Sequence, residues 1–88
     1  MRSYRLAPGV RWAVERSAVK LTDAKGTVRT LRYPEAAVWD LLSRGYAFDK
    51  VVSMITHIAA LDSPGANVLV RTSVEDWAQS GFIEMDKG

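Results

Sequence analysis

The chain has 88 residues, of which 48% are hydrophobic, and a net charge of +2 from 12 basic and 10 acidic side chains. These values predict one globular domain over residues 1–88 and argue against disorder, which needs low hydrophobicity and high net charge. The small charge imbalance does not favour nucleic acid as a partner. The lack of cysteine excludes disulfides and thiolate metal sites and favours the cytoplasm. Neither a secretory signal nor an apolar stretch of about 20 residues is found, so no membrane partner is expected.

Three strands are expected in the first third of the chain. Residues 10–15 alternate between apolar and polar side chains, residues 18–22 repeat the alternation, and residues 27–32 are rich in β-branched side chains. The segment Asp23-Ala24-Lys25-Gly26 predicts a turn between the last two strands, with its glycine at positive φ. The alternation predicts a first strand that is half-buried.

Two features of these strands bear on which of their apolar residues face the core. Val28 and Leu31 have opposite parity, so either a bulge intervenes or one of the two faces out. Trp12 stands between two valines on the first strand, and we expect it in the core. Trp39 and Trp77 have helical core spacing and are expected to be buried as well.

Three helices are expected in the rest of the chain, at residues 33–45, 49–60 and 66–80. Pro34 suits the first helical position, and Asp62-Ser63-Pro64-Gly65 predicts a break before the third helix. Phe82 and Ile83 read as a short apolar tail. The predicted fold class is α+β, a winged helix-turn-helix-like arrangement of a three-stranded antiparallel sheet followed by three helices.

The sequence contains little chemistry of the kind that enzymes use. His57 is the only histidine and has no second metal ligand at helical spacing, so a surface position is expected. The carboxylate pair Glu75 and Asp76 is typical of a solvated helix surface. We therefore expect no catalytic residue, no metal and no cofactor.

A winged-helix domain would bind DNA through its third helix. That helix carries one cation, Arg71, and two acids, Glu75 and Asp76, so its net charge is negative and DNA phosphates would repel it. Nucleic-acid binding is therefore an alternative function and not the favoured one. A second alternative is a small dimerisation module, in which the edge strand pairs with its own copy.

The segment Tyr4-Arg5-Leu6-Ala7-Pro8-Gly9-Val10-Arg11-Trp12 resembles the opening of the pyrroloquinoline quinone biosynthesis protein D family. The three strands, the three helices and the closing Gly81-Phe82-Ile83 are also similar, so the resemblance covers nearly the whole chain. It implies a peptide recognition element that binds the leader segment of a ribosomally synthesised precursor peptide. Such a domain presents the peptide to a radical S-adenosylmethionine enzyme or another modifying enzyme.

The same resemblance implies where the peptide binds. The leader would add a strand beside the third strand and pack against the third helix, so that main-chain hydrogen bonds give affinity and side-chain pockets give specificity. Edge hydrogen bonding alternates along a strand, and the sequence leaves open whether Thr30 or Arg29 presents its donor to the ligand. The expected peptide-binding residues are Thr27, Val28, Arg29, Thr30, Leu31, Arg32, Leu69, Arg71, Thr72, Ser73 and Asp76.

Overall fold

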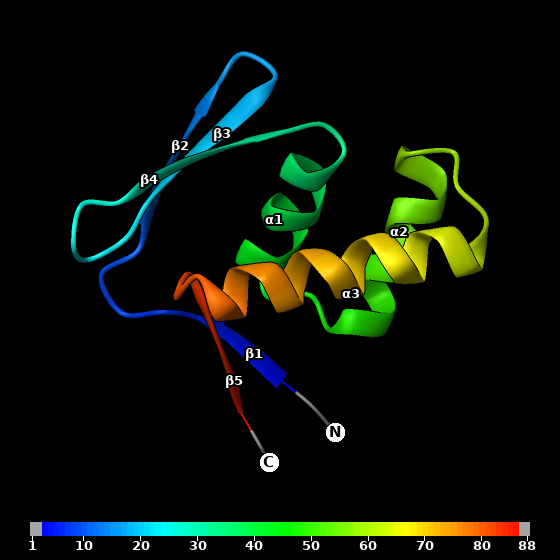
Figure 1. Ribbon diagram of the computed structural model, residues 1–88. Coiled ribbons are helices and arrows are strands. Elements are labelled where there is room, and N and C mark those ends of the chain that lie inside the picture. The colour runs from blue at the N-terminus through cyan, green and yellow to red at the C-terminus, as the bar shows by residue number, and fades with distance from the viewer. Residues whose placement is uncertain (1–2, 87–88) are drawn as a thin grey trace.

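The computed structural model describes residues 3–86 and arranges them as three helices and two small sheets. The elements in chain order are β1 (Ser3–Leu6), β2 (Arg11–Glu15), β3 (Ala18–Thr22), β4 (Val28–Arg32), α1 (Glu35–Ser43), α2 (Phe48–Ile58), α3 (Ser63–Gln79) and β5 (Ile83–Asp86). β2, β3 and β4 form an antiparallel sheet in chain order, and the three helices follow it along the chain and lie on one of its faces (Figure 1). The α+β class with a three-stranded sheet and then three helices is confirmed.

The two ends of the described chain form a second sheet that the sequence did not predict. β1 pairs with β5 antiparallel, from Ser3 opposite Asp86 to Leu6 opposite Ile83. Phe82 and Ile83 are therefore no loose tail, because their side chains are only 1% and 3% exposed. A four-residue strand whose partner lies about 80 residues away leaves no local pattern that identifies the pairing.

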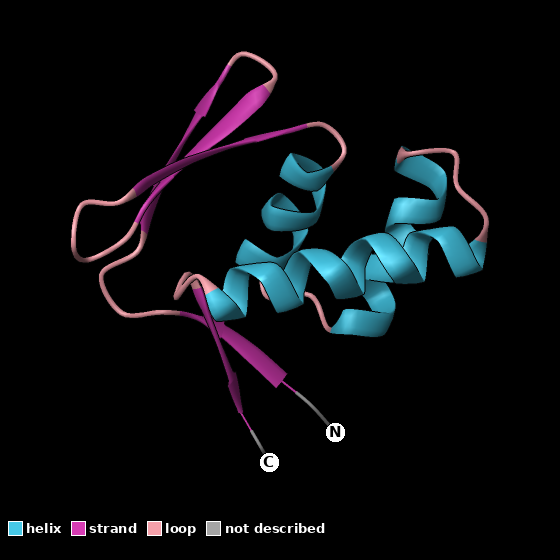
Figure 2. Cartoon of the chain, viewed as in Figure 1, coloured by secondary structure: helices cyan, strands magenta, loops and turns pink. Residues whose placement is uncertain are grey.

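The prediction of a half-buried first strand is wrong for β2, whose five residues are all exposed. Trp12 is 41% exposed and Val14 is 71% exposed. The reason is position: β2 is the edge strand opposite β4, and the β2–β3 hairpin extends beyond the helices (Figure 2). The large apolar side chains of β2 face the helical side of the sheet but stay exposed, because little of the helical body covers them.

The core lies between the three-stranded sheet and the helices. Trp39 and Trp77 are fully buried, as expected, and their rings meet edge to face with centroids 5.3 Å apart. The ring of Trp12 lies 5.8 Å from that of Trp39, so the half-exposed tryptophan still joins the aromatic cluster. Edge-to-face pairs add about 0.5–1.5 kcal/mol beyond their burial. The cluster thus ties β2, α1 and α3 together.

The third helix begins at Ser63, three residues before its expected start. The Asp62 side chain accepts a hydrogen bond of 2.8 Å from the Gly65 amide, and Pro64 lies in the first turn, where its missing amide hydrogen costs nothing. The residues that predict a break in the chain are therefore the N-terminal cap and first turn of α3. No helix within residues 3–86 is long and apolar enough to cross a membrane.

Candidate functional site

β4 is an edge strand. It pairs with β3 on one side, and no strand within residues 3–86 pairs with its other side. An unpaired edge presents a row of amide and carbonyl groups, which is a template for another strand. This open edge is the first half of the candidate site.

The register shows which residues of β4 offer their main-chain groups at that edge. The hairpin closes with a hydrogen bond of 3.0 Å from the Asp23 amide to the Thr27 carbonyl. Antiparallel pairs alternate between bonded and non-bonded, and the pairing is continuous from Thr22–Val28 to Ala18–Arg32. Arg29 and Leu31 therefore bond to β3. The N–H and C=O groups of the alternate residues, with Thr30 at the centre, point to the open edge.

The side chains of β4 alternate in the same way. Leu31 is 2% exposed and faces the core, while Val28 is 50% exposed on the opposite face of the sheet. The continuous register leaves no room for a bulge, so of the two sequence alternatives the outward-facing valine is correct. Thr30 and Arg32 are exposed on the same outer side as Val28.

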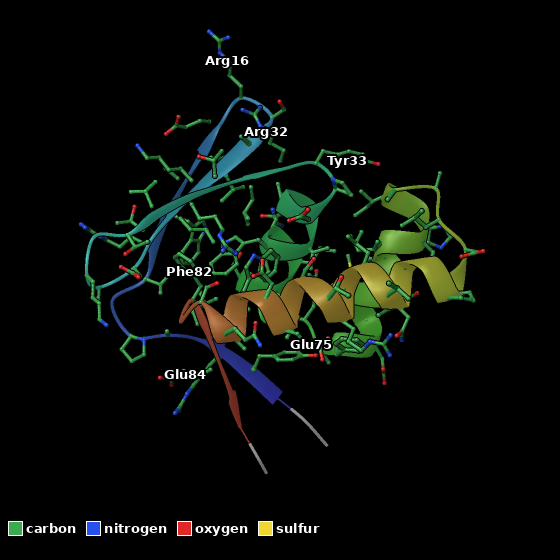
Figure 3. All side chains as sticks on the ribbon, in the orientation of Figure 1. Arg16, Arg32, Tyr33, Glu75, Phe82 and Glu84 are labelled. Carbon is green, nitrogen blue, oxygen red and sulfur yellow. The ribbon has the colours of Figure 1, made fainter. Side chains whose placement is uncertain are left out.

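Arg29 points to the inner side and connects β4 to α3. Its Nη1 donates to Asp76 Oδ2 at 2.7 Å, and its guanidinium carbon lies 5.8 Å from the centre of the Phe82 ring. The side chains of the pair are 36% and 52% exposed, so the contact is open to water. Phe82 lies beneath the sheet at the end of α3 (Figure 3). This contact shows that the flank of α3 that carries Asp76 is turned toward β4.

Four of the expected helix residues share that flank. Thr72 and Ser73 lie three and four residues after Leu69, and Asp76 lies four and three residues after them, which places the four in one stripe. Leu69 is partly buried and Ser73 is 6% exposed. Arg71 is exposed and lies about 140° around the helix from Asp76, since five residues correspond to that rotation. The structure thus does not bring Arg71 together with the other expected residues.

Thr27 lies outside the strand. Its amide donates to Asp23 Oδ1 at 2.8 Å, within the turn that joins β3 to β4. Gly26 has a φ of 88°, as the turn prediction requires. The amide of Thr27 is therefore occupied, and the strand that an incoming chain could pair with is Val28–Arg32.

We name Val28–Arg32 and the stripe Leu69, Thr72, Ser73 and Asp76 the β4–α3 face. It offers main-chain donors and acceptors, one ion pair, and side chains of mixed polarity. His57 is exposed on α2, which confirms its expected surface position. No group of three or more histidines and acids within residues 3–86 could hold a metal ion. The face can bind an extended chain, and nothing in its geometry points to a reaction.

Sequence reasoning missed the part that Phe82 plays in this face, where its ring supports Arg29 from below. Asp23 is expected in the turn, and the structure adds that its main chain and its carboxylate close the hairpin. The spacing Asp23-x-x-Gly26 is the turn signal, and together with the closing bond it fixes the register. No sequence signal places Phe82 under β4, because that contact depends on how α3 packs.

The fold has a solved counterpart. The structure titled "TbiB1 in Complex with the TbiA(beta) Leader Peptide" superposes with a TM-score of 0.86 at 22% sequence identity, over 91% of this chain and 94% of that one. The chain matches no protein-family profile. No curated protein matches it significantly in sequence. At this identity the likeness establishes a shared fold.

Proposed function

We propose that this protein binds the leader segment of a ribosomally synthesised precursor peptide, as a strand added to the open edge of β4. The observation that carries the proposal is the unpaired edge of β4 beside the α3 stripe, joined by the Arg29–Asp76 contact. The similarly folded TbiB1 structure contains a leader peptide, which supports the same ligand class here. In this proposal the protein acts without catalysis and presents the peptide to a modifying enzyme in the cytoplasm, a location that suits a chain without cysteine.

The energetics assign different roles to the two halves of the face. Val28, Thr30 and Arg32 together offer six main-chain groups, each worth about 1 kcal/mol net when bonded. Ordering each peptide residue costs about 1–2 kcal/mol, so the main-chain bonds only offset the loss of freedom. The net affinity must therefore come from peptide side chains that pack on the α3 stripe. The edge of β4 sets the orientation, and α3 sets which peptide is chosen.

Amide hydrogen exchange tests the strand addition. The leader peptide, taken from a precursor gene located by a search of the genomic neighbourhood, should slow exchange at Val28, Thr30 and Arg32, whose amides the register directs to the open edge. Arg29 and Leu31 already bond to β3 and should change little. Protection confined to other segments, with these three amides still exchanging freely, would show that the peptide binds elsewhere.

The two alternative functions make different predictions. α3 carries Arg71 against Glu75 and Asp76, so as a recognition helix it would meet phosphate with a net negative charge. Pairing of β4 with β4 of a second copy of the protein would use the same edge as the peptide. A peptide that binds there should therefore dissociate such a dimer. Sedimentation of the protein with and without the peptide separates dimerisation from peptide binding.

A further inference from the structure

Charge is unevenly distributed along this chain. Residues 10–32, which build the three-stranded sheet, contain six cations and two acids, a net charge of +4. Residues 33–82, which build the helices, contain three cations and six acids, a net charge of −3. A net charge of +2 for the whole chain conceals this division. The sheet and the helical body therefore present fields of opposite sign.

The positive charge gathers on the face of the sheet that points away from the helices. Register and parity put these outward side chains in three rows across the strands: Arg11, Thr22 and Val28; Ala13, Lys20 and Thr30; Glu15, Ala18 and Arg32. We name these nine residues the outer sheet face. It has three cations and one acid, and most of its other members are alanine and threonine. Small side chains around the cations leave a flat surface that a partner could approach closely.

None of these charges is neutralised within the described chain. The ion pairs between residues 3 and 86 are Arg5–Glu84, Arg29–Asp76 and Arg44–Asp40, and none involves the outer sheet face. Glu15 and Arg32 share a row but are separated by the strand that carries Ala18, about 10 Å between them. All nine residues are exposed or half-exposed, and every helix lies on the other side of the sheet (Figure 1). Figure 3 shows Arg16 extending from the hairpin tip, away from the helices, so a further cation borders the face.

We propose that the outer sheet face is a docking surface for an acidic patch on the protein that acts on the bound peptide. This inference rests on the proposed function. A peptide strand added at β4 would extend the same sheet, so a protein docked on the outer sheet face would lie directly beside the peptide. Complementary charge would orient that protein and speed its association through outward side chains, leaving the main-chain groups at the edge of β4 to the peptide.

Two other occupants of the outer sheet face are less favoured. Nucleic acid extends beyond the outer sheet face, so its phosphates would also meet the net negative helical body, which repels them, whereas a local acidic patch meets the face alone. A second copy of this chain could present its acidic helices to the outer sheet face. That contact is head-to-tail and would continue from copy to copy, giving open-ended assemblies.

The test uses a matched pair of charge reversals and a polycarboxylate probe. Lys20→Glu changes the centre of the outer sheet face, and Lys50→Glu makes the same change at an exposed position on α2. The probe is a fluorescein-labelled polyglutamate peptide of 20 residues, measured by anisotropy at low salt. Lys20→Glu should weaken its binding about three- to tenfold, and Lys50→Glu by less than about twofold. Carbodiimide coupling followed by mass spectrometry should join the probe to Lys20 in preference to Lys50.

Three results would overturn the proposal. The first is equal loss of polyglutamate binding in both variants. The second is tighter binding of a 20-base-pair duplex DNA than of polyglutamate, lost with Lys20→Glu, which would assign the face to nucleic acid. The third is concentration-dependent self-association that Lys20→Glu abolishes. Neither variant alters the β4–α3 face, so binding of the leader peptide should persist in both, and its loss would count against the proposed function instead.

Discussion

Arg29 is the residue that joins the sheet to α3 at the candidate site. Its contacts with Asp76 and the Phe82 ring are made by half-exposed charged groups, which water and salt screen. Asp76→Asn should therefore lower the free energy of unfolding by less than about 1 kcal/mol. Urea unfolding followed by tryptophan fluorescence measures this value. A loss of several kcal/mol would mean that the pair behaves as a buried one.

Ala60 ends α2 in a conformation that favours glycine. Its φ is 53°, and the Leu61 amide that follows it donates to the Thr56 carbonyl at 3.2 Å, which completes a Schellman motif. A left-handed alanine costs about 1–2 kcal/mol, while glycine adds about 0.5–1 kcal/mol of unfolded-state entropy. Ala60→Gly should therefore raise the free energy of unfolding by about 0.5–1 kcal/mol, or the melting temperature by about 3–6 °C.

The preceding residue provides the control for this substitution. Ala59 has a φ of −100°, so glycine relieves no strain there and Ala59→Gly should only destabilise. Scanning calorimetry of the two variants side by side measures the difference. Equal melting temperatures would show that the left-handed turn at Ala60 is not formed in solution.

At the scale of elements, the β1–β5 ribbon has a structural role in the candidate site. Phe82 links α3 to β5, its side chain is 1% exposed, and its ring lies beneath Arg29. Phe82→Ala should lower the free energy of unfolding by about 3–5 kcal/mol, a large part of the stability of a domain of this size. Phe82→Leu, which keeps most of the buried volume, should cost about 1–2 kcal/mol. Denaturant unfolding compares the two, and a cost below about 1 kcal/mol for the alanine variant would contradict the burial.

The elements that the sequence predicts are those whose evidence is local. β3 and β4 follow from alternation and a turn signal, and α2 follows from a clear apolar stripe. β1 and β5 could not be predicted, because four residues carry too little periodicity and their partners lie at opposite ends of the chain. The exposure of Trp12 could not be predicted either, since it depends on how far the hairpin extends beyond the helices.

The candidate site, too, follows from the sequence only in part. Helical spacing alone groups Leu69, Thr72, Ser73 and Asp76, but only the contact with Arg29 shows that this stripe faces β4. Arg71 is adjacent to Thr72 in sequence, but one step along a helix is a turn of about 100°, which takes it out of the stripe. From the sequence the choice between Thr30 and Arg29 is open, because the side-chain pattern does not reveal which residue pairs of the two strands are hydrogen-bonded. The bond that closes the hairpin at Asp23 points to Thr30.

At the scale of the whole molecule, the two proposals give separate roles to three surfaces. In these proposals the open edge of β4 orients a peptide, the α3 stripe selects it, and the outer sheet face receives the protein that acts on it. The first two surfaces meet at the Arg29–Asp76 contact, and the third carries an excess of positive charge. Substitutions of the side chains on β2 and β3 in the outer sheet face should therefore leave peptide affinity unchanged, and loss of a main-chain donor at the edge of β4 should weaken it.

The proposed addition of the peptide as a strand to β4 requires the Thr30 amide, so the decisive substitution is Thr30→Pro. Proline removes the amide that the register directs to the open edge and leaves the bonds to β3 in place, so the protein should stay folded by circular dichroism. Thr30→Val, which keeps the amide, is the matched control. Isothermal titration calorimetry with the leader peptide should show affinity at least about fivefold weaker for the proline variant and close to the parent for the valine variant. A folded Thr30→Pro protein that binds the leader as tightly as the parent would contradict strand addition.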